Sequence, residues 1–255
     1  MALLTHWEGE PVHVWAGLWG SPLVEAHDTL GSTNDRARWL AREGAEAYTV
    51  VVANEQTAGR GRSGSPWHSA PGAGLWMSTL LPLPGAPPPY LPLLVGLAAA
   101  AALEDACPAV RVGLKWPNDL EIHGRKVGGI LCEHAHGPVV AGIGLNVSQK
   151  VEDFPQDLAE RAVSLEMAGG RRISVGTLAT ALLRELRARC AANGGSLPDD
   201  ARAELAARDV LLDRPVHTQQ SGEGVARGID ADGALLVEQE GGRRVRVVAG
   251  TVRIR

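Results

Sequence analysis

Two arginines alternate with glycines in a segment that can close over an anionic ligand. Gly59-Arg60-Gly61-Arg62-Ser63-Gly64 has the spacing G-x-G-x-x-G and follows a predicted strand. A dinucleotide fold would need a helix to begin here, but Pro66 prevents one, and the lysine of a Walker A loop is missing. A mobile loop remains, whose backbone amides and planar guanidinium groups suit phosphate or carboxylate oxygens. A solvated surface loop with incidental arginines is the alternative.

A lysine stands at the end of a predicted apolar strand in Lys115-Trp116-Pro117-Asn118-Asp119. Pro117 stops the strand, which leaves Lys115 at its edge. An ammonium there is costly unless it is paired or functional, and it can neutralise charge that develops on a phosphate or carboxylate oxygen. A lysine that reaches solvent at the rim of the sheet is the alternative.

Paired glycines occur in two predicted strands, within Lys126-Val127-Gly128-Gly129-Ile130-Leu131 and Gly142-Ile143-Gly144-Leu145-Asn146-Val147. Glycine weakens a strand and often marks a ligand that lies against the backbone. Two such strands side by side would form a flat floor without side chains. A pure packing role is the alternative.

Other predicted elements must bring these segments together. The clearest is an amphipathic helix at 175–189, whose apolar residues recur at helical offsets along one face. Further helices are predicted at 35–43, 91–106 and 199–208, and strands at 48–54, 75–81, 110–116, 126–133 and 139–147. Residues 1–23 show no strong period, and we interpret them as a leader.

The tail changes character near residue 208. From residue 210 short predicted strands alternate with turns at 221–222, 232–233 and 241–242, and Asp232-Gly233 is a typical hairpin turn. The sequence therefore predicts an α/β domain at 1–208 and a small β domain at 209–255.

The formal net charge is −4, and a general nucleic-acid binder would show a basic face instead. Charges interrupt the N-terminal residues before an apolar core develops, and the most apolar segment, 91–106, is too short to span a bilayer. We expect a cytoplasmic protein with neither DNA nor a membrane as partner.

Together the motifs resemble those of the biotin–protein ligase family, and they occur in the same order along the chain. The matching segments are Ser32-Thr33-Asn34, Gln56 with Gly59–Arg62 and Trp67, Lys115–Asp119, Arg125–Leu131, and Gly142–Val147. The resemblance implies an α/β (α+β) fold: a mixed-sheet catalytic core of the class II aminoacyl-tRNA synthetase and biotin ligase type, followed by a small SH3-like β-barrel.

The resemblance also implies the reaction. Members join biotin to ATP, with Mg²⁺, to give biotinyl-5′-AMP and pyrophosphate. They then pass biotin to a lysine of a biotin carboxyl carrier protein domain of acetyl-CoA carboxylase. A carboxylate does not acylate an amine at neutral pH, so it is first converted to a mixed anhydride. Dimers are common in the family, although the sequence marks no interface.

The resemblance carries site residues over to this chain. Catalysis is expected of Lys115, Arg60 and Arg62. Biotin contacts are expected of Ser32, Thr33, Asn34, Gln56, Gly59, Arg60, Gly61, Arg62, Lys115, Gly128, Gly129 and Gly142. Nucleotide contacts are expected of Arg62, Trp67, Asn118, Lys126, Gly144 and Asn146. No protein nucleophile is expected, and no residue is assigned to the metal.

Two departures from the family pattern bear on function. Ser63 stands where a basic residue is common, which weakens retention of the adenylate. The first 23 residues do not have the pattern of a helix-turn-helix, so we expect a ligase without repressor activity. A lipoate–protein ligase, a nucleic-acid-contacting loop and a carrier of small apolar ligands are the alternatives.

Overall fold

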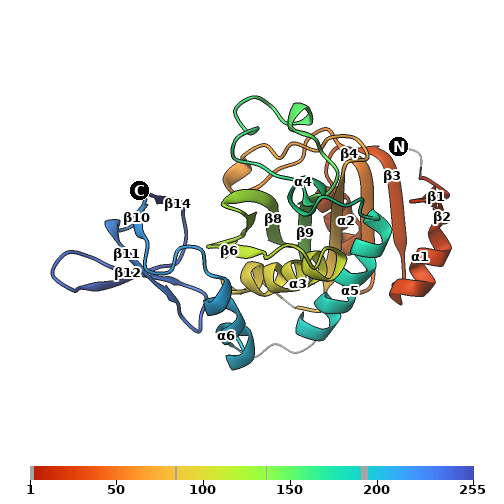
Figure 1. The fold of residues 1–255 in the computed structure, drawn as a ribbon. Helices are drawn as coiled ribbons and strands as arrows, with labels where there is room; N and C mark the ends of the chain where they lie inside the picture. Colours follow the sequence, from red (N-terminus) through yellow and green to blue (C-terminus); the bar gives the residue numbers. More distant parts are fainter. Residues whose placement is uncertain (1–2, 84, 136, 191–194) are drawn as a thin grey trace.

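The computed structural model describes residues 3–83, 85–135, 137–190 and 195–255. These residues form a seven-stranded mixed sheet, in the order β3-β4-β5-β9-β8-β7-β6 (Figure 1). Only β3 and β4 pair in parallel within it. The strands are β3 (Val24–Leu30), β4 (Val50–Gln56), β5 (Gly74–Leu81), β6 (Gly113–Lys115), β7 (Asp119–Ile122), β8 (Arg125–His134) and β9 (Val139–Asn146).

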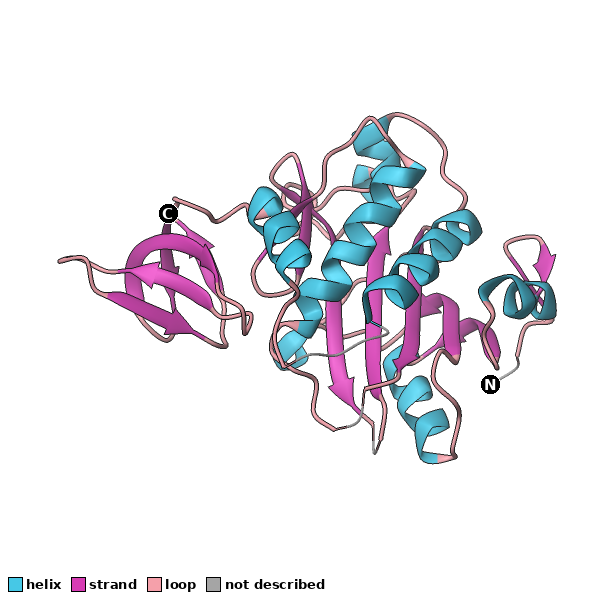
Figure 2. Cartoon of the chain, turned by 90° about the horizontal axis from the view of Figure 1, so that it is seen from below, coloured by secondary structure: helices cyan, strands magenta, loops and turns pink. Residues whose placement is uncertain are grey.

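Helices cover both faces of this sheet. On one face lie α3 (Leu91–Ala106) and α5 (Val175–Cys190), which cross in front of the strands in Figure 2. On the other face lies α2 (Thr33–Arg42). Alternation along β4 shows the division, because Val50 and Val52 join the core with α3 and α5, whereas Val51 and Ala53 join the core with α2.

The Ala-rich helix α3 is buried between the sheet and α5. Leucine, valine and alanine occupy almost every position, so the helix has no polar face to turn to solvent. Pro92 lies in its first turn, where the missing amide costs no hydrogen bond. No helix in the described ranges is both long and apolar enough to cross a bilayer.

The interpretation of residues 1–23 as a leader is wrong for the part that the structure describes. A short hairpin, β1 (His6–Trp7) with β2 (Glu10–Pro11), leads into α1 (Val12–Trp19). Trp7, Trp15 and Trp19 pack on one another with ring centroids 5.3–5.8 Å apart, and Trp15 Nε1 donates to the Trp7 carbonyl at 2.7 Å. Elements this short give no readable period.

Strands β3 and β7 were not predicted, and the strand predicted at 110–116 is shorter, at 113–115. The sequence of β3 is polar, yet Glu25 and His27 are buried in it. Arg36 of α2 donates to both carboxylate oxygens of Glu25 at 2.7 and 2.8 Å. Burial raises the pKa of Glu25, but the ion pair with Arg36 outweighs it and lowers the pKa. Because the partner comes from a later helix, the local sequence gives no sign of this strand.

The C-terminal residues form a separate antiparallel sheet in the order β13-β12-β11-β10-β14. Its strands are β10 (Pro215–Thr218), β11 (Gly222–Ile229), β12 (Leu235–Glu238), β13 (Arg244–Val247) and β14 (Val252–Ile254), drawn in blue in Figure 1. The expected class, a mixed α/β core followed by a small β domain, is confirmed. The α6 helix (Asp199–Arg208) precedes this sheet, and division of the chain after residue 208 stays a prediction.

A buried contact joins the small sheet to the core. Trp116 Nε1 donates to the carbonyl of Gly233 at 2.9 Å. Gly233 has φ +87°, and a Cβ there would approach Tyr90 Cα to 2.6 Å. Glycine is therefore required twice at this turn, for its backbone conformation and for the close approach.

Gly233→Ala should lower the free energy of unfolding by about 3 kcal/mol, from backbone strain plus the clash with Tyr90. Gly241→Ala is the matched control, because Gly241 has φ +84° with open space around it. It should cost about 1 kcal/mol. Urea unfolding measures both variants. Equal losses would show that the contact with Tyr90 adds nothing.

Candidate active site

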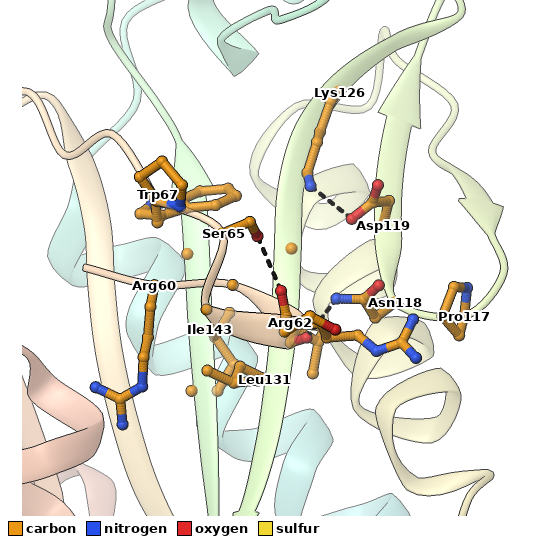
Figure 3. Close-up of a pocket in the computed structure, with 18 of the residues that line it drawn as sticks. Arg60, Arg62, Ser65, Trp67, Pro117, Asn118, Asp119, Lys126, Leu131 and Ile143 are labelled. Atoms are coloured by element: carbon orange, nitrogen blue, oxygen red, sulfur yellow. Dashed lines mark hydrogen bonds and ion pairs between the residues drawn. The ribbon is translucent and has the colours of Figure 1, made fainter. Parts of the chain in front are cut away.

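A cavity of about 520 Å³ lies on the α2 face of the sheet. The start of α2, the end of β4, the Gly-Arg loop (residues 57–73), the turn before β7 and the C-terminal domain all contribute to its wall. Figure 3 shows its central side chains. The predicted site residues that line it are Ser32, Thr33, Asn34, Gln56, Arg60, Gly61, Arg62, Trp67, Lys115, Asn118, Lys126, Gly129, Gly142 and Gly144.

One end of the cavity is a chain of polar groups at the start of α2. Gln56 Oε1 accepts from the backbone N–H of Thr33 at 2.8 Å and from its hydroxyl at 3.0 Å. Ser78 Oγ lies 2.8 Å from Thr33 Oγ1 and 2.6 Å from Asn34 Oδ1. The preceding Ser32 makes no side-chain cap bond within the described part of the chain. This end therefore offers donors and acceptors held in fixed positions.

The paired glycines meet on the cavity face, but side chains cover them. Gly129 lies opposite Gly144 in the register of β8 with β9. A Cβ would approach the Trp67 ring to 2.7 Å at Gly144 and 3.1 Å at Gly129, and one at Gly142 would overlap Asn34. The glycines therefore leave space for the side chains of Trp67 and Asn34. They do not form the floor without side chains that the sequence predicted.

Gly128 lies on the opposite face of the same strand. A Cβ there would approach Leu145 Cδ2 to 2.6 Å and Leu120 Cδ1 to 3.1 Å. Side chains of adjacent residues in a strand point to opposite faces, so Gly128 and Gly129 cannot both face the cavity. The structure brings Gly129, Gly142 and Gly144 to the cavity and turns Gly128 to the core.

The two arginines of the loop point in opposite directions (Figure 3). Arg60 donates to both oxygens of Asp35 at 2.6 and 2.7 Å and to Glu133 at 3.1 Å. The hydrogen bonds from Arg60 lower the pKa of Asp35. Arg62 Nη1 donates instead to the carbonyl of Gly250 in the C-terminal domain at 3.2 Å. Burial lowers the pKa of Arg62, and the charge of Asp119 opposes this shift.

A second cavity, of about 490 Å³, adjoins the first. Its own walls include Asn146, Phe154, Leu158 and Arg161. The residues common to both cavities are Pro66, Trp67, Lys115, Asp119 and Lys126. The junction thus carries two ammonium groups and an indole.

Both ammonium groups at the junction are paired with carboxylates. Lys115 Nζ lies 3.1 Å from Glu121 Oε1, and Lys126 Nζ lies 2.6 Å from Asp119 Oδ1. Lys126 Nζ also lies 5.3 Å from the centroid of the Trp67 ring. The junction can therefore receive an anion by exchange of partners, without burying a new unpaired charge.

Three further predicted residues have internal hydrogen-bonding or packing roles. Asn118 Nδ2 donates to the Ile130 carbonyl at 2.7 Å, which fixes the turn before β7 against β8. Asn146 is buried at the end of β9, where its Nδ2 donates to the Val163 carbonyl at 3.2 Å. Gly59 lies at the base of the loop, where a Cβ would approach the Trp67 carbonyl to 3.0 Å.

Sequence reasoning missed several residues that line the cavities or hold the Gly-Arg loop beside them. Asp35 and Glu133 carried a readable signal, since one directly follows Ser-Thr-Asn and the other lies two positions after Leu131, on the same strand face. Phe154 had no motif around it. Gln219 and Thr251 of the C-terminal domain also line the first cavity, and only the docking of that domain brings them there.

Within the described residues no cluster of three or more His, Cys, Asp or Glu side chains is arranged to hold a metal ion. The acidic groups nearest the junction, Asp119 and Glu121, already pair with lysines.

Comparison with known proteins agrees with this arrangement. Residues 28–149 match the model of the biotin/lipoate A/B protein ligase family, and residues 213–255 match the biotin protein ligase C-terminal domain. The chain is 38% identical to the biotin–[acetyl-CoA-carboxylase] ligase of Mycobacterium tuberculosis over 232 residues, which cover 87% of this chain and 85% of that protein. It is also 38% identical to the bifunctional ligase/repressor BirA of Bacillus subtilis, over 85% of this chain and 69% of that protein.

A solved structure shares the fold. The biotin protein ligase of Aquifex aeolicus in complex with biotin and ATP superposes with a TM-score of 0.81 at 27% identity, over 92% of this chain and all of that one. Fold and site define a small-molecule–protein ligase. The chain belongs to the biotin/lipoate A/B protein ligase family, as the resemblance predicted.

Gly144→Ala should displace Trp67 from the strand, because the added methyl group would occupy the position of the indole. The indole N–H resonance of Trp67, assigned with Trp67→Phe, should shift and broaden. Gly31→Ala is the control, since a Cβ there meets open space. An unchanged resonance in Gly144→Ala would show that Trp67 does not lie on the glycines in solution.

Proposed function

We propose that this chain is an ATP-dependent biotin–protein ligase that forms biotinyl-5′-AMP and transfers biotin to a lysine of a biotin carboxyl carrier protein. Membership of the family and the names of the relatives support the reaction class. The single observation that carries the proposal is the position of Lys115 at the junction of the two cavities. A carboxylate in one cavity and an α-phosphate in the other would meet at its ammonium.

Biotin would occupy the first cavity. Thr33, Gln56 and Ser32 would hydrogen-bond its polar ureido ring, which needs both donors and acceptors. Leu131, which lines the same cavity and lies opposite Gly142 on its face of the sheet, would contact the apolar part of the molecule. Its carboxylate would then point to Lys115.

The nucleotide would occupy the second cavity. Phe154 and Leu158 offer an apolar surface to the base, and Lys126 and Arg161 offer cations to the phosphates. Trp67 would pack over the intermediate where the cavities join. Asn118 and Asn146 would contribute to nucleotide binding mainly by fixing the backbone around the second cavity, through their hydrogen bonds to the carbonyls of Ile130 and Val163. Mg²⁺ would be held by phosphate oxygens, and it would supply neutralisation of their charge.

The chemistry follows from these positions. A biotin carboxylate oxygen attacks the α-phosphorus of ATP, the bond to the β-phosphate oxygen breaks, and pyrophosphate leaves. Lys115 would stabilise the negative charge on the oxygens of both groups during this attack. Arg62 would hold the adenylate while the loop excludes water. The neutral amine of the acceptor lysine then attacks the acyl carbon, AMP leaves, and the amine loses its proton.

Biotin-dependent exchange of labelled pyrophosphate into ATP tests the proposal, with lipoate as the control acid. Exchange with biotin alone is the expected result. Exchange with lipoate alone would assign the chain to the other branch of its family. Binding of biotin without exchange would favour a carrier and overturn the ligase proposal.

Lys115→Ala should slow pyrophosphate exchange by about 10²–10³-fold, as for removal of one charge-stabilising donor. Because the substitution leaves Glu121 without its lysine partner, thermal unfolding should be measured to show how much stability is lost. Lys150→Ala is the control, because it removes an ammonium outside both cavities. Exchange within about threefold of the wild type would remove Lys115 from the mechanism.

Arg62→Gly should form the adenylate yet lose it to solvent about tenfold faster, because the hydrogen bond to Gly250 and the buried charge both disappear. Released adenylate acylates exposed lysines at random, so biotin should appear on an added bystander protein. Labelling confined to the carrier domain would contradict this role of the loop.

A further inference from the structure

The first arginine of the loop is bound by two carboxylates from different elements. Arg60 forms a two-pronged ion pair with Asp35 of α2 and a second ion pair with Glu133 of β8, at 2.6 and 3.1 Å. The Arg60 and Glu133 side chains are 25% and 24% exposed, so solvent screens this pair only partly. A guanidinium engaged in this way has its charge neutralised by the two carboxylates, and it points away from Arg62 and Lys126 (Figure 3).

Glu133 connects this ion pair to the polar end of the cavity. Its Oε2 accepts from Asn34 Nδ2 at 2.7 Å, and the same oxygen accepts from Arg60. Asn34 Oδ1 in turn lies 2.6 Å from Ser78 Oγ. The carboxylate of Glu133 therefore joins a loop residue to a side chain that lines the cavity.

The connection continues to the far end of the loop. From Ser78 it passes through Thr33 to Gln56, and Gln56 Nε2 donates to Ser69 Oγ at 3.3 Å. Arg60 and Ser69 lie near opposite ends of the Gly-Arg loop. Both ends are thus tied to one hydrogen-bonded network at the polar end of the cavity.

We propose that Asp35, Glu133 and Arg60 form a latch that holds the Gly-Arg loop closed, and that Glu133 couples the latch to Asn34 in the biotin cavity. These are positioning residues: they act on the reaction through the loop and not by contact with the reacting atoms. The inference rests on the proposed function, and it gives Arg60 a role different from binding of the substrate anions.

A physical consequence follows for ligand binding. A ligand in the polar end fixes the Asn34 amide, which fixes the Glu133 carboxylate and thereby the position of Arg60. The loop then loses less conformational freedom when it closes, because its first anchor is already in place. By reciprocity, a closed latch strengthens retention of whatever occupies the cavity.

Glu133→Gln tests the latch with a minimal change. The amide oxygen can still accept from Asn34, while the negative charge that faces Arg60 is lost. We expect release of biotinyl-5′-AMP to rise about tenfold and trypsin to cut after Arg60 or Arg62 about tenfold faster in the ligand-free protein. Initial adenylation at saturating biotin should stay within about threefold, because no reacting group changes.

Arg38→Gln is the matched control. Arg38 lies 3.6 Å from Asp35 and 3.8 Å from Glu133, but it belongs to α2 and not to the loop. Its loss should change adenylate release and loop cleavage by less than about twofold. Asp35→Asn, at a side chain that is 57% exposed, repeats the test should Glu133→Gln fail to fold.

A double-mutant cycle separates a latch from direct anion binding. If Arg60 acts through Asp35, Arg60→Gln and Asp35→Asn should each raise adenylate release, and the double variant should add little more. Additive effects, with a larger effect for Arg60→Gln, would overturn the latch and return Arg60 to the ligand. Wild-type release or cleavage in both Glu133→Gln and Asp35→Asn would also overturn it.

The two proposals fail separately. Loss of loop protection in the ligand-free Glu133→Gln variant supports the latch whatever the substrate is. Absence of biotin-dependent pyrophosphate exchange in the wild type would overturn the ligase proposal alone.

Discussion

The paired glycines of β8 and β9 determine where the rest of the site can lie. Gly129 and Gly144 face each other there, and the Trp67 ring rests on them. Glycine inside a strand costs about 0.5–1 kcal/mol relative to alanine. The buried contact between the sheet, α3 and α5 can offset that cost. With the indole this close to the backbone, the Gly-Arg loop can lie across the sheet and divide the space above it into two adjoining cavities.

Charged side chains at the junction of the two cavities are arranged as ion pairs. The chain is acidic overall, yet the junction of the cavities carries two lysines, each held by a carboxylate. Such pairs keep the ammonium groups in place without the cost of an unpaired buried charge, and a phosphate can replace the carboxylate as partner. Arg62 differs, because its guanidinium donates to the carbonyl of Gly250 while burial destabilises its charge. A nearby anion would offset that desolvation by favouring the charged form of the guanidinium.

The elements that could be predicted are those whose own sequence decides their structure. The apolar helix α3, the amphipathic helix α5 and the β-branched strand β4 follow from periodicity and propensity. The strand β3 does not, because its buried Glu25 depends on Arg36 from a later helix. The same limit applies within the site: its motifs were readable, but the ion pairs that orient Arg60 depend on α2 and β8.

The C-terminal sheet completes the first cavity because two contacts fix it close to the loop. Trp116, next to the junction lysine, donates to Gly233, and Arg62 of the loop donates to Gly250. The first contact is buried and involves no residue of the loop. The second involves Arg62, so it depends on the position of the loop. Closure therefore uses a surface that the Trp116 contact has already positioned, so little further ordering of the small domain is required.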